Sequence, residues 1–451
     1  MENKRVLIVG MGNSGKAAAQ AMVKLGAHVS VADSKKEEDI NPQLITFLKD
    51  KSVECYFGRL PQSISEFDVI ILSPGVPPEL DFIQEARAAG AEVIGELEIA
   101  YRVGKGNYVA ITGTNGKTTT TTLVGEIYKR AGKKTYVVGN IGVAVISKAL
   151  MADDDSWLIT ETSSFQLETI KEFKPAVSAI LNLTPDHMDR HKTMERYSAA
   201  KADIFKNQTE KEYCIINYDD RECVRMAKKC RAKVVPFSRI KQLDFGAFVK
   251  EEHIVIKDEA GEGHSICRTD ELLIPGSHNL ENALAACAIA YFGGIDPEDI
   301  AEAVREFKGV EHRIELCGEI DGIKFVNDSK GTNPDAAIKA IEAMKKDIIL
   351  IAGGYDKGAS FDEFVKAFDG KVKALLLLGK TATKIKDTAE KAGFTNTIIL
   401  KDMEACVREA YGMAKAGDVV LLSPACASWD MYSNFEQRGS HFKSCVEGLE
   451  R

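Results

Sequence analysis

The sequence has no C-x-x-C pair, no long hydrophobic run and no excess of positive charge. Its 10 cysteines are scattered over 451 residues, which is typical of reduced thiols and argues against a disulfide framework or a zinc site. The formal net charge of −8 disfavours a broad electrostatic surface for nucleic acid or anionic lipid. We therefore expect neither nucleic acid nor membrane as a partner, and any anionic ligand must be held by locally placed donors.

Targeting features are also missing from the first residues. Charged residues lead directly into a short apolar run, Arg5–Val9, and a glycine turn, so the apolar run is too short for a signal peptide. No segment is long enough to span a bilayer. We expect a soluble, cytoplasmic protein and a monomer. The chain has no internal repeats and no low-complexity tracts.

Short apolar runs alternate with helical patterns along the chain, which predicts an α/β protein with parallel sheets. The length suggests about three domains. We predict a Rossmann-like N-terminal domain over 1–98, a central α/β domain with an added β segment over 99–309, and a C-terminal Rossmann-like α/β domain over 310–451. The predicted strands are Arg5–Val9, Val29–Ala32, Val69–Leu72, Tyr108–Thr112, Thr135–Val138, Trp157–Thr160, Ala176–Leu183, Ile348–Ala352, Ala374–Leu378 and Val419–Leu422.

Two hairpins and three helices complete this outline. Asp321-Gly322 lies between the apolar runs Arg313–Ile320 and Ile323–Asn327, which is the signal of a two-residue hairpin turn. A second turn is predicted near Gly261–His264, within the added β segment. The predicted helices are Lys16–Leu25, Glu96–Val103 and Asn279–Tyr291.

Residues 111–119, Ile-Thr-Gly-Thr-Asn-Gly-Lys-Thr-Thr, follow a predicted strand and open a predicted helix. Glycines let backbone N–H groups surround phosphate oxygens, while the lysine and the next hydroxyl suit phosphate and magnesium. Ile111 stands where the general motif has its first glycine. An ordinary glycine turn is the alternative, but the five threonines 118–122 are a poor helix start. The pattern predicts a P-loop ATPase-like central domain, with ATP contacts from Gly113, Thr114, Asn115, Gly116, Lys117, Thr118 and Thr119.

Two later strands end in polar residues that suit a metal ion. Trp157–Thr160 is followed by Glu161, and the run to Leu183 leads into Asp186 and His187. Ligands of parallel sheets collect at the carboxyl ends of strands, where a carboxylate can hold magnesium beside the P-loop hydroxyl. A lone histidine is more often structural, but this position makes His187 a candidate.

The first domain carries a dinucleotide fingerprint. Gly10-x-Gly12-x-x-Gly15 follows a strand, and Asp33 comes about twenty residues later. Two alternatives are therefore open at this point, an NAD-dependent oxidoreductase with a separate P-loop domain and a regulatory nucleotide-binding module. Consumed NAD would favour the first, and ATP binding without amine-dependent turnover would favour the second.

Five stretches together resemble the Mur ligase family of peptidoglycan synthesis, which also includes folylpolyglutamate synthases. They are GMGNSG at 10–15, GTNGKT at 113–118, NLTPDHMDR at 182–190, NDSKGTN at 327–333 and SPACASWDMYSNFEQRG at 423–439. The resemblance covers essentially the whole chain, whereas folylpolyglutamate synthases lack the first domain. It implies an ATP-dependent ligase that adds D-glutamate to UDP-N-acetylmuramoyl-L-alanine through an acyl phosphate, giving ADP and phosphate.

The resemblance also implies roles for single residues around ATP. Lys117 would hold the transferring phosphate, Thr118 and Glu161 one magnesium ion, and His187 with a carbamylated Lys201 a second. Mn²⁺ could replace Mg²⁺, and no NAD is expected. By its residue type alone, Lys201 is a solvated helix lysine. The further nucleotide contacts would be Asn279, Asn282, Arg313, Asp328 and Lys330.

For the UDP-muramoyl substrate, the resemblance implies Gly12, Asn13, Ser14, Asp33, Ser34, Lys35, Ser73, Pro74, Gly75, Gly139, Asn140, Ser163 and His187. Relatives often have arginine at position 35, and a guanidinium stacks on a base better than an ammonium does. For D-glutamate it implies Thr332, Lys357, Ser428 and the backbone N–H of Phe435. Helix capping is the alternative for Asn279, and surface charge is the alternative for Arg313 and Lys357.

Overall fold

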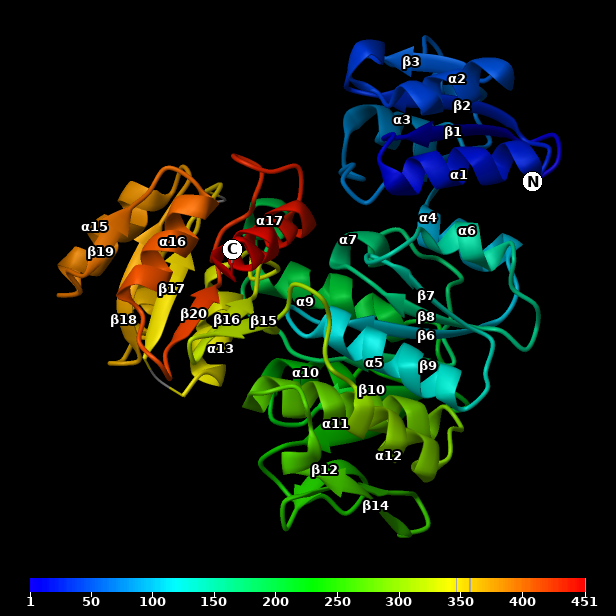
Figure 1. Ribbon diagram of the computed structural model, residues 1–451. Helices are drawn as coiled ribbons and strands as arrows, with labels where there is room; N and C mark the ends of the chain where they lie inside the picture. Colours follow the sequence, from blue (N-terminus) through cyan, green and yellow to red (C-terminus); the bar gives the residue numbers. More distant parts are fainter. Residues whose placement is uncertain (346, 357, 451) are drawn as a thin grey trace. The chain divides into compact units, whose positions relative to one another are not determined.

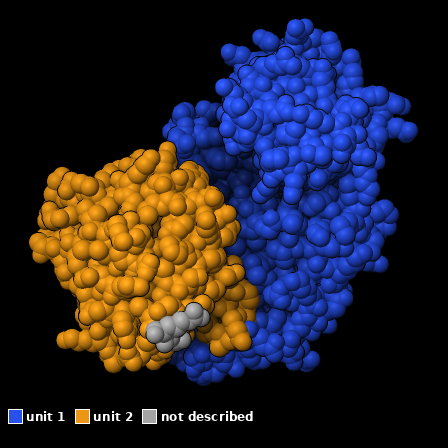
Figure 2. Space-filling model, turned by 45° about the horizontal axis from the view of Figure 1, so that its top comes forward, with its two compact units in different colours: residues 1–271, 281–306 blue, residues 272–280, 307–451 orange. Residues whose placement is uncertain are grey.

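The computed structural model describes residues 1–345, 347–356 and 358–450. The predicted α/β class is confirmed, because three sheets alternate with helices along the chain (Figure 1). The chain forms two compact units, residues 1–271 with 281–306 and residues 272–280 with 307–451 (Figure 2). Within the described ranges, no helix is both long and apolar enough to cross a membrane.

The first sheet is wholly parallel, as predicted, in the order β3-β2-β1-β4-β5. The direction of winding reverses between β1 and β4, so the loops that follow these two strands are neighbours at the carboxyl edge. Both faces of β1 are buried, as crossover helices require. The strands of this sheet and the helices between them are β1 (Arg5–Val9), α1 (Asn13–Lys24), β2 (His28–Asp33), α2 (Pro42–Asp50), β3 (Glu54–Phe57), β4 (Val69–Leu72), α3 (Asp81–Ala88) and β5 (Glu92–Gly95).

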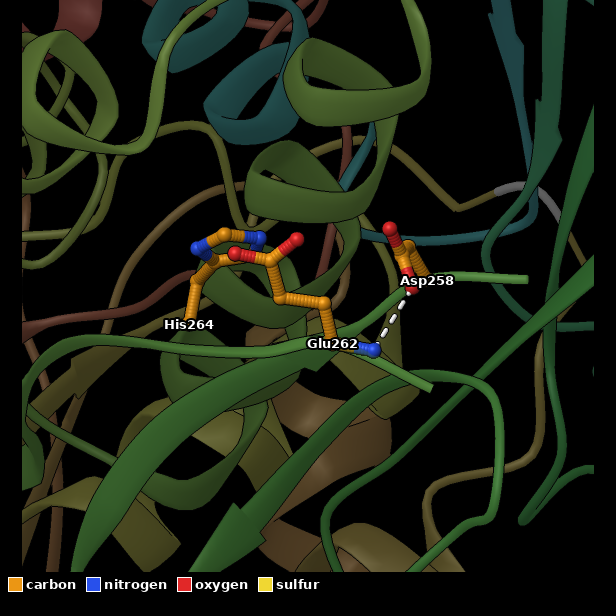
Figure 3. Close-up of side chains that lie close together, drawn as sticks. All are labelled: Asp258, Glu262 and His264. Carbon is orange, nitrogen blue, oxygen red and sulfur yellow. Dashed lines mark hydrogen bonds between the residues drawn. The ribbon is translucent and has the colours of Figure 1, made fainter. Parts of the chain in front are cut away.

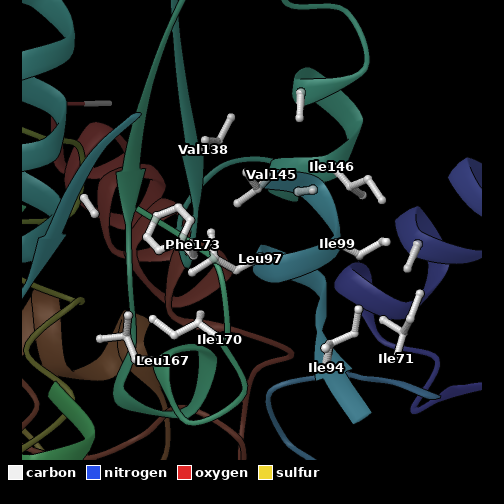
Figure 4. Close-up of a cluster of buried hydrophobic side chains, with 14 of the residues drawn as sticks. Ile71, Ile94, Leu97, Ile99, Val138, Val145, Ile146, Leu167, Ile170 and Phe173 are labelled. Carbon is white, nitrogen blue, oxygen red and sulfur yellow. The ribbon is translucent and has the colours of Figure 1, made fainter. Parts of the chain in front are cut away.

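Helix α4 (Glu96–Val103) joins this sheet to the next through one continuous apolar core. Ile71 and Ile94 of the first sheet belong to the same buried cluster as Leu97, Val138 and Phe173 (Figure 4). Because each of these side chains is almost completely removed from water, the cluster stabilises the junction mainly through the hydrophobic effect.

Two glutamates of α4 are buried at this junction but have different surroundings. Glu98 accepts hydrogen bonds from the backbone N–H groups of Lys171, Glu172 and Phe173 at 2.9, 2.9 and 3.0 Å, and from Arg102 Nε at 2.7 Å. Glu96 Oε1 accepts from the N–H of Ile146 at 2.7 Å, while Oε2 has no hydrogen-bond partner among the described residues. Burial raises the pKa of Glu96 to about 7.

The central sheet has nine strands in the order β14-β13-β12-β11-β10-β9-β6-β8-β7. The strands from β7 to β12 are parallel, and β12 to β14 form the antiparallel added segment. The predicted turn near Gly261–His264 lies at 258–262, because β14 already begins at Gly263. The strands are β6 (Asn107–Thr112), β7 (Thr135–Gly139), β8 (Trp157–Glu161), β9 (Val177–Ile180), β10 (Tyr213–Asn217), β11 (Lys233–Ser238), β12 (Gly246–Lys250), β13 (His253–Lys257) and β14 (Gly263–Arg268).

Helices cover the central sheet between and beyond these strands. Residues 117–122 form a helix in spite of the threonine run, because Leu123, Val124 and Ile127 are buried on its inner face. The helices are α5 (Lys117–Arg130), α6 (Val145–Ala149), α7 (Ser164–Leu167), α8 (Met188–His191), α9 (Met194–Ala202), α10 (Arg221–Ala227), α11 (Ser277–Phe292) and α12 (Pro297–Glu306).

The third sheet has the order β15-β16-β20-β17-β18-β19, with only the β15–β16 pair antiparallel. The predicted hairpin is confirmed, since Ile320 pairs with Ile323 and both Asp321 (φ 51°) and Gly322 (φ 75°) are left-handed. The first strand of this hairpin was predicted to begin at Arg313, but in the structure it begins two residues later, at Glu315. The elements are β15 (Glu315–Ile320), β16 (Ile323–Asn327), α13 (Pro334–Ala343), β17 (Ile348–Ala352), α14 (Asp362–Lys366), β18 (Val372–Leu377), α15 (Ala382–Lys391), β19 (Thr397–Ile399), α16 (Met403–Met413), β20 (Val419–Leu422) and α17 (Phe435–Glu447).

Candidate functional site

The predicted phosphate loop joins the end of β6 to the start of α5. Gly113 and Gly116 have φ values of 155° and 82°, which favour glycine. A Cβ atom on Gly116 would lie 2.2 Å from Asn282 Oδ1, so a side chain at this position would displace Asn282. Helix α5 begins directly after this turn, and the N-terminus of a helix suits an anion. The ATP contacts of residues 113–119 stay a prediction.

Lys117 is the first residue of α5 and folds back over this loop. Its ammonium donates to the carbonyl oxygens of Gly113 at 2.9 Å and Thr114 at 2.7 Å. The positive charge is thus held inside the loop, where phosphate oxygens could accept hydrogen bonds from it.

Two residues from the segment after β9 brace the loop. The side chain of Asn182 accepts from the N–H of Asn115 at 2.8 Å and donates to its carbonyl at 3.0 Å. Thr114 Oγ1 donates to the carbonyl of Thr184 at 3.0 Å. Sequence reasoning did not assign Asn182 to the site, because only the fold brings it to a residue that is 67 positions away.

Lys201 of α9 lies directly beneath the same loop. Its ammonium donates to Gly113 O at 2.8 Å and lies 4.8 Å from the centre of the Tyr197 ring. The residue is only 2% exposed, which corrects the expectation from residue type alone of a solvated lysine. Burial, and secondly the charge of Lys117, hold the pKa of Lys201 well below its usual value.

Glu161 ends β8 beside the loop and is 1% exposed. Its Oε1 accepts from Asn140 Nδ2 at 2.9 Å, whereas Oε2 is buried without a hydrogen-bond partner in the described part of the chain. An unpaired buried carboxylate oxygen is costly unless a cation is present. Together with the buried Thr118 at the start of α5, this donor set fits Mg²⁺.

The two neighbouring histidines differ in environment. His187 precedes α8 in a left-handed conformation, with φ 53°, and its ring lies 4.8 Å from that of Phe165. His191 is buried, with Nε2 2.9 Å from Ser164 Oγ. Burial, and secondly the charge of His187, lower the pKa of His191 to about 4. His191 therefore has a structural role as a neutral imidazole, and His187 is the more accessible of the two.

The glycine loop of the first domain is also closely packed. Ser73 Oγ donates to Gly10 O at 2.7 Å, and a Cβ on Gly15 would lie 1.8 Å from that same oxygen. Asp33 accepts from the N–H groups of Met11 at 2.6 Å and Lys35 at 2.9 Å. The carboxylate that the fingerprint singles out thus holds the glycine loop in place.

A cavity of about 480 Å³ opens beside this loop. Of the predicted substrate residues, Asp33, Ser34 and Gly75 line it, while Lys35 does not. Sequence reasoning missed Arg59, which follows β3 and also lines the cavity.

Arg190 connects the first domain to the central one. It donates to the carbonyl of Pro74 at 3.1 Å and to Glu168 Oε2 at 2.7 Å, and its guanidinium lies 4.3 Å from the Phe165 ring centre. Ser163 caps the neighbouring helix α7, with its hydroxyl accepting from the N–H of Gln166 at 3.2 Å. The predicted substrate residues Pro74 and Ser163 therefore also contribute to the local structure.

In the third domain, the loops after β16, β17 and β20 meet. Ser423 Oγ donates to Asp328 Oδ2 at 2.7 Å, and the N–H of Gly353 donates to Pro424 O at 2.8 Å. Burial raises the pKa of Asp328 to about 6, although the charge of Arg313 opposes this shift. The predicted residues Asp328 and Arg313 are therefore close enough for the charge of Arg313 to act on the Asp328 carboxyl.

The remaining predicted residues of the third domain and of the start of α11 are placed as follows. The ammonium of Lys330 lies 5.1 Å from the centre of the Phe435 ring. Ser428 is buried, and Thr332 follows Lys330 in the loop after β16. Asn279 is the third residue of α11, and its Nδ2 donates to Pro275 O at 2.7 Å, which is not the contact of an N-cap residue. Lys357 lies outside the described residues.

Sequence reasoning also missed the buried Arg438, which fastens two of these loops together. Its guanidinium donates to Ser329 O at 2.7 Å and to Cys426 O at 3.1 Å. Arginine is normally exposed, so only the fold shows that this residue organises the loops.

A separate group of possible metal ligands lies on the β13–β14 hairpin, at the outer edge of the central sheet. Figure 3 shows the carboxylate of Glu262 beside the His264 ring, with Asp258 across the turn. The N–H of Glu262 donates to Asp258 Oδ1 at 2.8 Å, and His264 Nε2 lies 3.1 Å from the Tyr291 hydroxyl. These contacts explain the turn without a metal ion.

Comparison with known proteins agrees with this arrangement over the whole chain. Residues 4–95 match the Mur ligase MurD-like N-terminal domain, 111–290 the Mur ligase middle domain and 312–426 the Mur ligase glutamate ligase domain. A UDP-N-acetylmuramoylalanine–D-glutamate ligase of Alkaliphilus oremlandii is 51% identical over 456 residues, covering 100% of both chains. One from Clostridioides difficile is 47% identical over 451 residues, again covering 100% of both.

Solved structures share the fold at low sequence identity. A pseudomurein peptide ligase type C from Methanothermus fervidus has a TM-score of 0.61 at 19% identity, covering 99% of this chain and 100% of its own. A UDP-N-acetylmuramate-alanine ligase of Thermotoga maritima has a TM-score of 0.61 at 18% identity over the same shares. The chain belongs to the Mur ligase family, because three domain models of this family match it and a full-length relative is 51% identical.

Proposed function

We propose that the chain is an ATP-dependent ligase that adds D-glutamate to UDP-N-acetylmuramoyl-L-alanine in peptidoglycan precursor synthesis. Full-length relatives at 51% and 47% identity carry this activity in their names. In the structure, the observation that carries the proposal is the P-loop lysine, Lys117, beside the buried Glu161 and Lys201. This arrangement suits phosphoryl transfer to a carboxylate.

The reaction has two chemical steps. In the first, a carboxylate oxygen of the muramoyl substrate attacks the γ-phosphorus of ATP, and ADP leaves. In the second, the amine nitrogen of D-glutamate attacks the acyl carbon, phosphate leaves with the electrons of the C–O bond, and the amine loses a proton. The N–H groups at the start of α5 and the ammonium of Lys117 hold the transferring phosphoryl oxygens, because charge is spread over these oxygens in the transition state.

We assign Thr118 and Glu161 to one Mg²⁺ and His187 and Lys201 to a second. Bound Mg²⁺ offsets the negative charge of the phosphate oxygens. The unpaired Oε2 of Glu161 supports the first assignment. Asn140 orients this carboxylate through its hydrogen bond at 2.9 Å.

The environment of Lys201 supports its conversion to a carbamate. A lowered pKa increases the share of the uncharged amine, whose lone pair can attack the carbon of CO₂. A new N–C bond forms and the nitrogen loses a proton, which produces an anionic oxygen ligand in place of a cation.

We place the remaining substrates by domain. The cavity beside Gly10 would hold the UDP group, with Asp33, Ser34 and Gly75 in its lining. D-Glutamate would bind in the third domain, where two negative ends require separate donors. We assign it to Thr332, Lys357, Ser428 and the backbone N–H of Phe435.

Phosphate release by the full chain tests this proposal. We expect release that requires ATP, Mg²⁺, UDP-N-acetylmuramoyl-L-alanine and D-glutamate together. L-Glutamate, D-aspartate and meso-diaminopimelate serve as competing amines. A preference for L-glutamate or meso-diaminopimelate would contradict the proposed amine, and release without any amine would contradict the ligase chemistry.

A further inference from the structure

The cavity of about 480 Å³ in the first domain has a definite position relative to the sheet. It is lined by residues that follow β3, β2, β1 and β4, which are adjacent in this order. It therefore lies along the carboxyl edge of the parallel sheet, beside the switch point where α/β folds bind nucleotides.

The charges in this cavity are few. Within the described part of its lining, Arg59 is the only cationic residue. Lys35 is outside the lining, and its backbone N–H donates to Asp33 Oδ1 at 2.9 Å. The guanidinium carbon of Arg59 lies 5.7 Å from the centre of the Tyr56 ring, and the group makes no ion pair with a described residue. Tyr56 thus supports the guanidinium while its charge stays available.

The position of Arg59 in the sheet shows which end of a nucleotide it can reach. A diphosphate suits the glycine loop after β1, at the start of α1. Neighbouring strands are about 4.8 Å apart, so β3, two strands from β1, is roughly 10 Å from that loop. This is about the distance from the phosphates of a nucleotide to its base, so Arg59 is at the base end.

The apolar residues of the cavity agree with this placement. Leu60, the residue after Arg59, lines the cavity with an exposed fraction of 47%, and Leu80 lines it from the β4 side with an exposed fraction of 40%. Apolar side chains that face an open cavity suit the faces of a planar ring, whereas phosphate oxygens need donors. The wall nearest Arg59 is therefore suited to a nucleobase.

We propose that Arg59 binds the uracil ring of the UDP-sugar, with its guanidinium stacked between this ring and Tyr56. The family resemblance placed the uracil contact at position 35, where this chain has lysine. A guanidinium is planar and weakly hydrated and stacks on rings, which an ammonium does less well. This inference rests on the proposed function, because that function supplies the UDP-sugar as the substrate.

Nucleotide binding to Arg59→Ala, Arg59→Lys and Lys36→Ala tests the proposal. Lys36 is the matched control, because it is a nearby exposed lysine that does not line the cavity. We expect both Arg59 variants to weaken uridine and UMP binding in calorimetry by about tenfold. Inorganic pyrophosphate binding and the Lys36→Ala protein should be unchanged. The KM for UDP-N-acetylmuramoyl-L-alanine should rise by a similar factor with kcat preserved.

Three results would overturn the inference. They are unchanged UMP binding in Arg59→Ala, full recovery of binding in Arg59→Lys, and an equal loss of pyrophosphate binding, which would place Arg59 at the diphosphate. Because Arg59 is exposed, the variants should keep the melting temperature of the parent. UMP binding does not depend on ligation, so a parent without ligase activity would refute the proposed function alone. A ligating parent whose Arg59→Ala variant has a normal KM would refute only the role of Arg59.

Discussion

Two loops of this protein contain the same dipeptide after a strand, Gly15-Lys16 in the first domain and Gly116-Lys117 in the central domain. Helix α1 begins at Asn13, so Lys16 is already inside the helix, and its ammonium has no hydrogen bond or ion pair with the described residues. Helix α5 begins at Lys117 itself, whose ammonium donates to Gly113 O and Thr114 O. Helix α1 thus begins three residues before its lysine, whereas α5 begins at its lysine, and this difference decides whether the lysine side chain covers the loop.

The two loops also differ in the charge of their surroundings. The first loop borders a cavity with apolar walls, and Asp33 is occupied by backbone N–H groups. The second loop is surrounded by buried charged groups, including Glu161 and Lys201. Similar backbone geometry can hold phosphates at both places, but only the second has the charges that phosphoryl transfer requires. We infer that the first loop carries the UDP-sugar and the second performs chemistry on ATP.

The largest expected effect comes from removing the lysine of each loop in turn. Lys117→Ala should lower kcat on the order of 10³-fold or more, because a charge that offsets the transferring phosphoryl group is lost. Lys16→Ala makes the same change in the other loop and should alter kcat less than about threefold. Steady-state phosphate release measures both. Similar losses in the two variants would remove the distinction between the loops.

Lys201→Ala tests the buried charge beneath the second loop. The variant should lose most of its activity, and added acetate or formate should restore part of it by supplying a carboxylate at the metal position. Activity of the parent should also depend on dissolved CO₂. Absence of rescue, together with a parent that is indifferent to CO₂, would contradict the carbamate. Lys148→Ala, on α6, is a control for the addition of the salts.

A variant in the third domain should leave both nucleotide loops unaffected. Lys357 lies outside the described residues, and its assignment to D-glutamate is a prediction from the sequence. A charge-assisted hydrogen bond contributes about 1.5–3 kcal/mol, so Lys357→Ala should raise the KM for D-glutamate about tenfold or more with the KM for ATP unchanged. An unaltered KM for D-glutamate would remove Lys357 from the site.

The smallest expected effects concern the two buried glutamates of α4, which lies between the loops. Burial raises the pKa of Glu96 from 4.5 to about 7. The unfolded chain therefore releases this proton at lower pH than the folded protein does, and the parent loses stability as pH rises from 4.5 to 7. Glu96→Gln does not titrate, so its melting temperature relative to the parent should rise by a few degrees between pH 5 and pH 8.

Glu98→Gln is the matched control for this experiment. Glu98 accepts four hydrogen bonds. The side-chain amide of glutamine would place its NH₂ group opposite some of these N–H donors, so those hydrogen bonds would be lost. The melting temperature of this variant should fall by several degrees at pH 8. A Glu96→Gln difference that is the same at pH 5 and pH 8 would contradict the account of Glu96.

Local sequence signals were sufficient for many of the strands and for the position of the glycine turn between β6 and α5, whereas β3, β5, β10, β11 and β19 were not predicted. Arg5–Val9, Val69–Leu72 and Val419–Leu422 form strands with the predicted bounds, because each is a short apolar run that ends at a turn. The β3 strand was missed, since Glu54–Phe57 begins with a charge and lies at a sheet edge, where less burial is needed. The strand predicted over Ala176–Leu183 is only Val177–Ile180, because the residues beyond it turn to brace the P-loop.

Partners that are distant in sequence could not be found in this way. Lys201 lies 88 positions from Gly113, whose carbonyl it contacts, and an isolated helix lysine gives no sign of its burial. Only the family resemblance pointed to it. Arg59 was missed for a similar reason, because an arginine after a polar edge strand suggests a surface residue until the cavity is seen.

Titration of the parent protein with UMP and ADP in one calorimetric series tests the division between the two loops most directly. The account predicts one site for each nucleotide, and an affinity for UMP that changes by less than about twofold when ADP and Mg²⁺ are saturating. In the Lys117→Ala protein, ADP affinity should fall while UMP affinity remains. Displacement of UMP by ADP, or tight binding of NAD in place of UMP, would contradict the account.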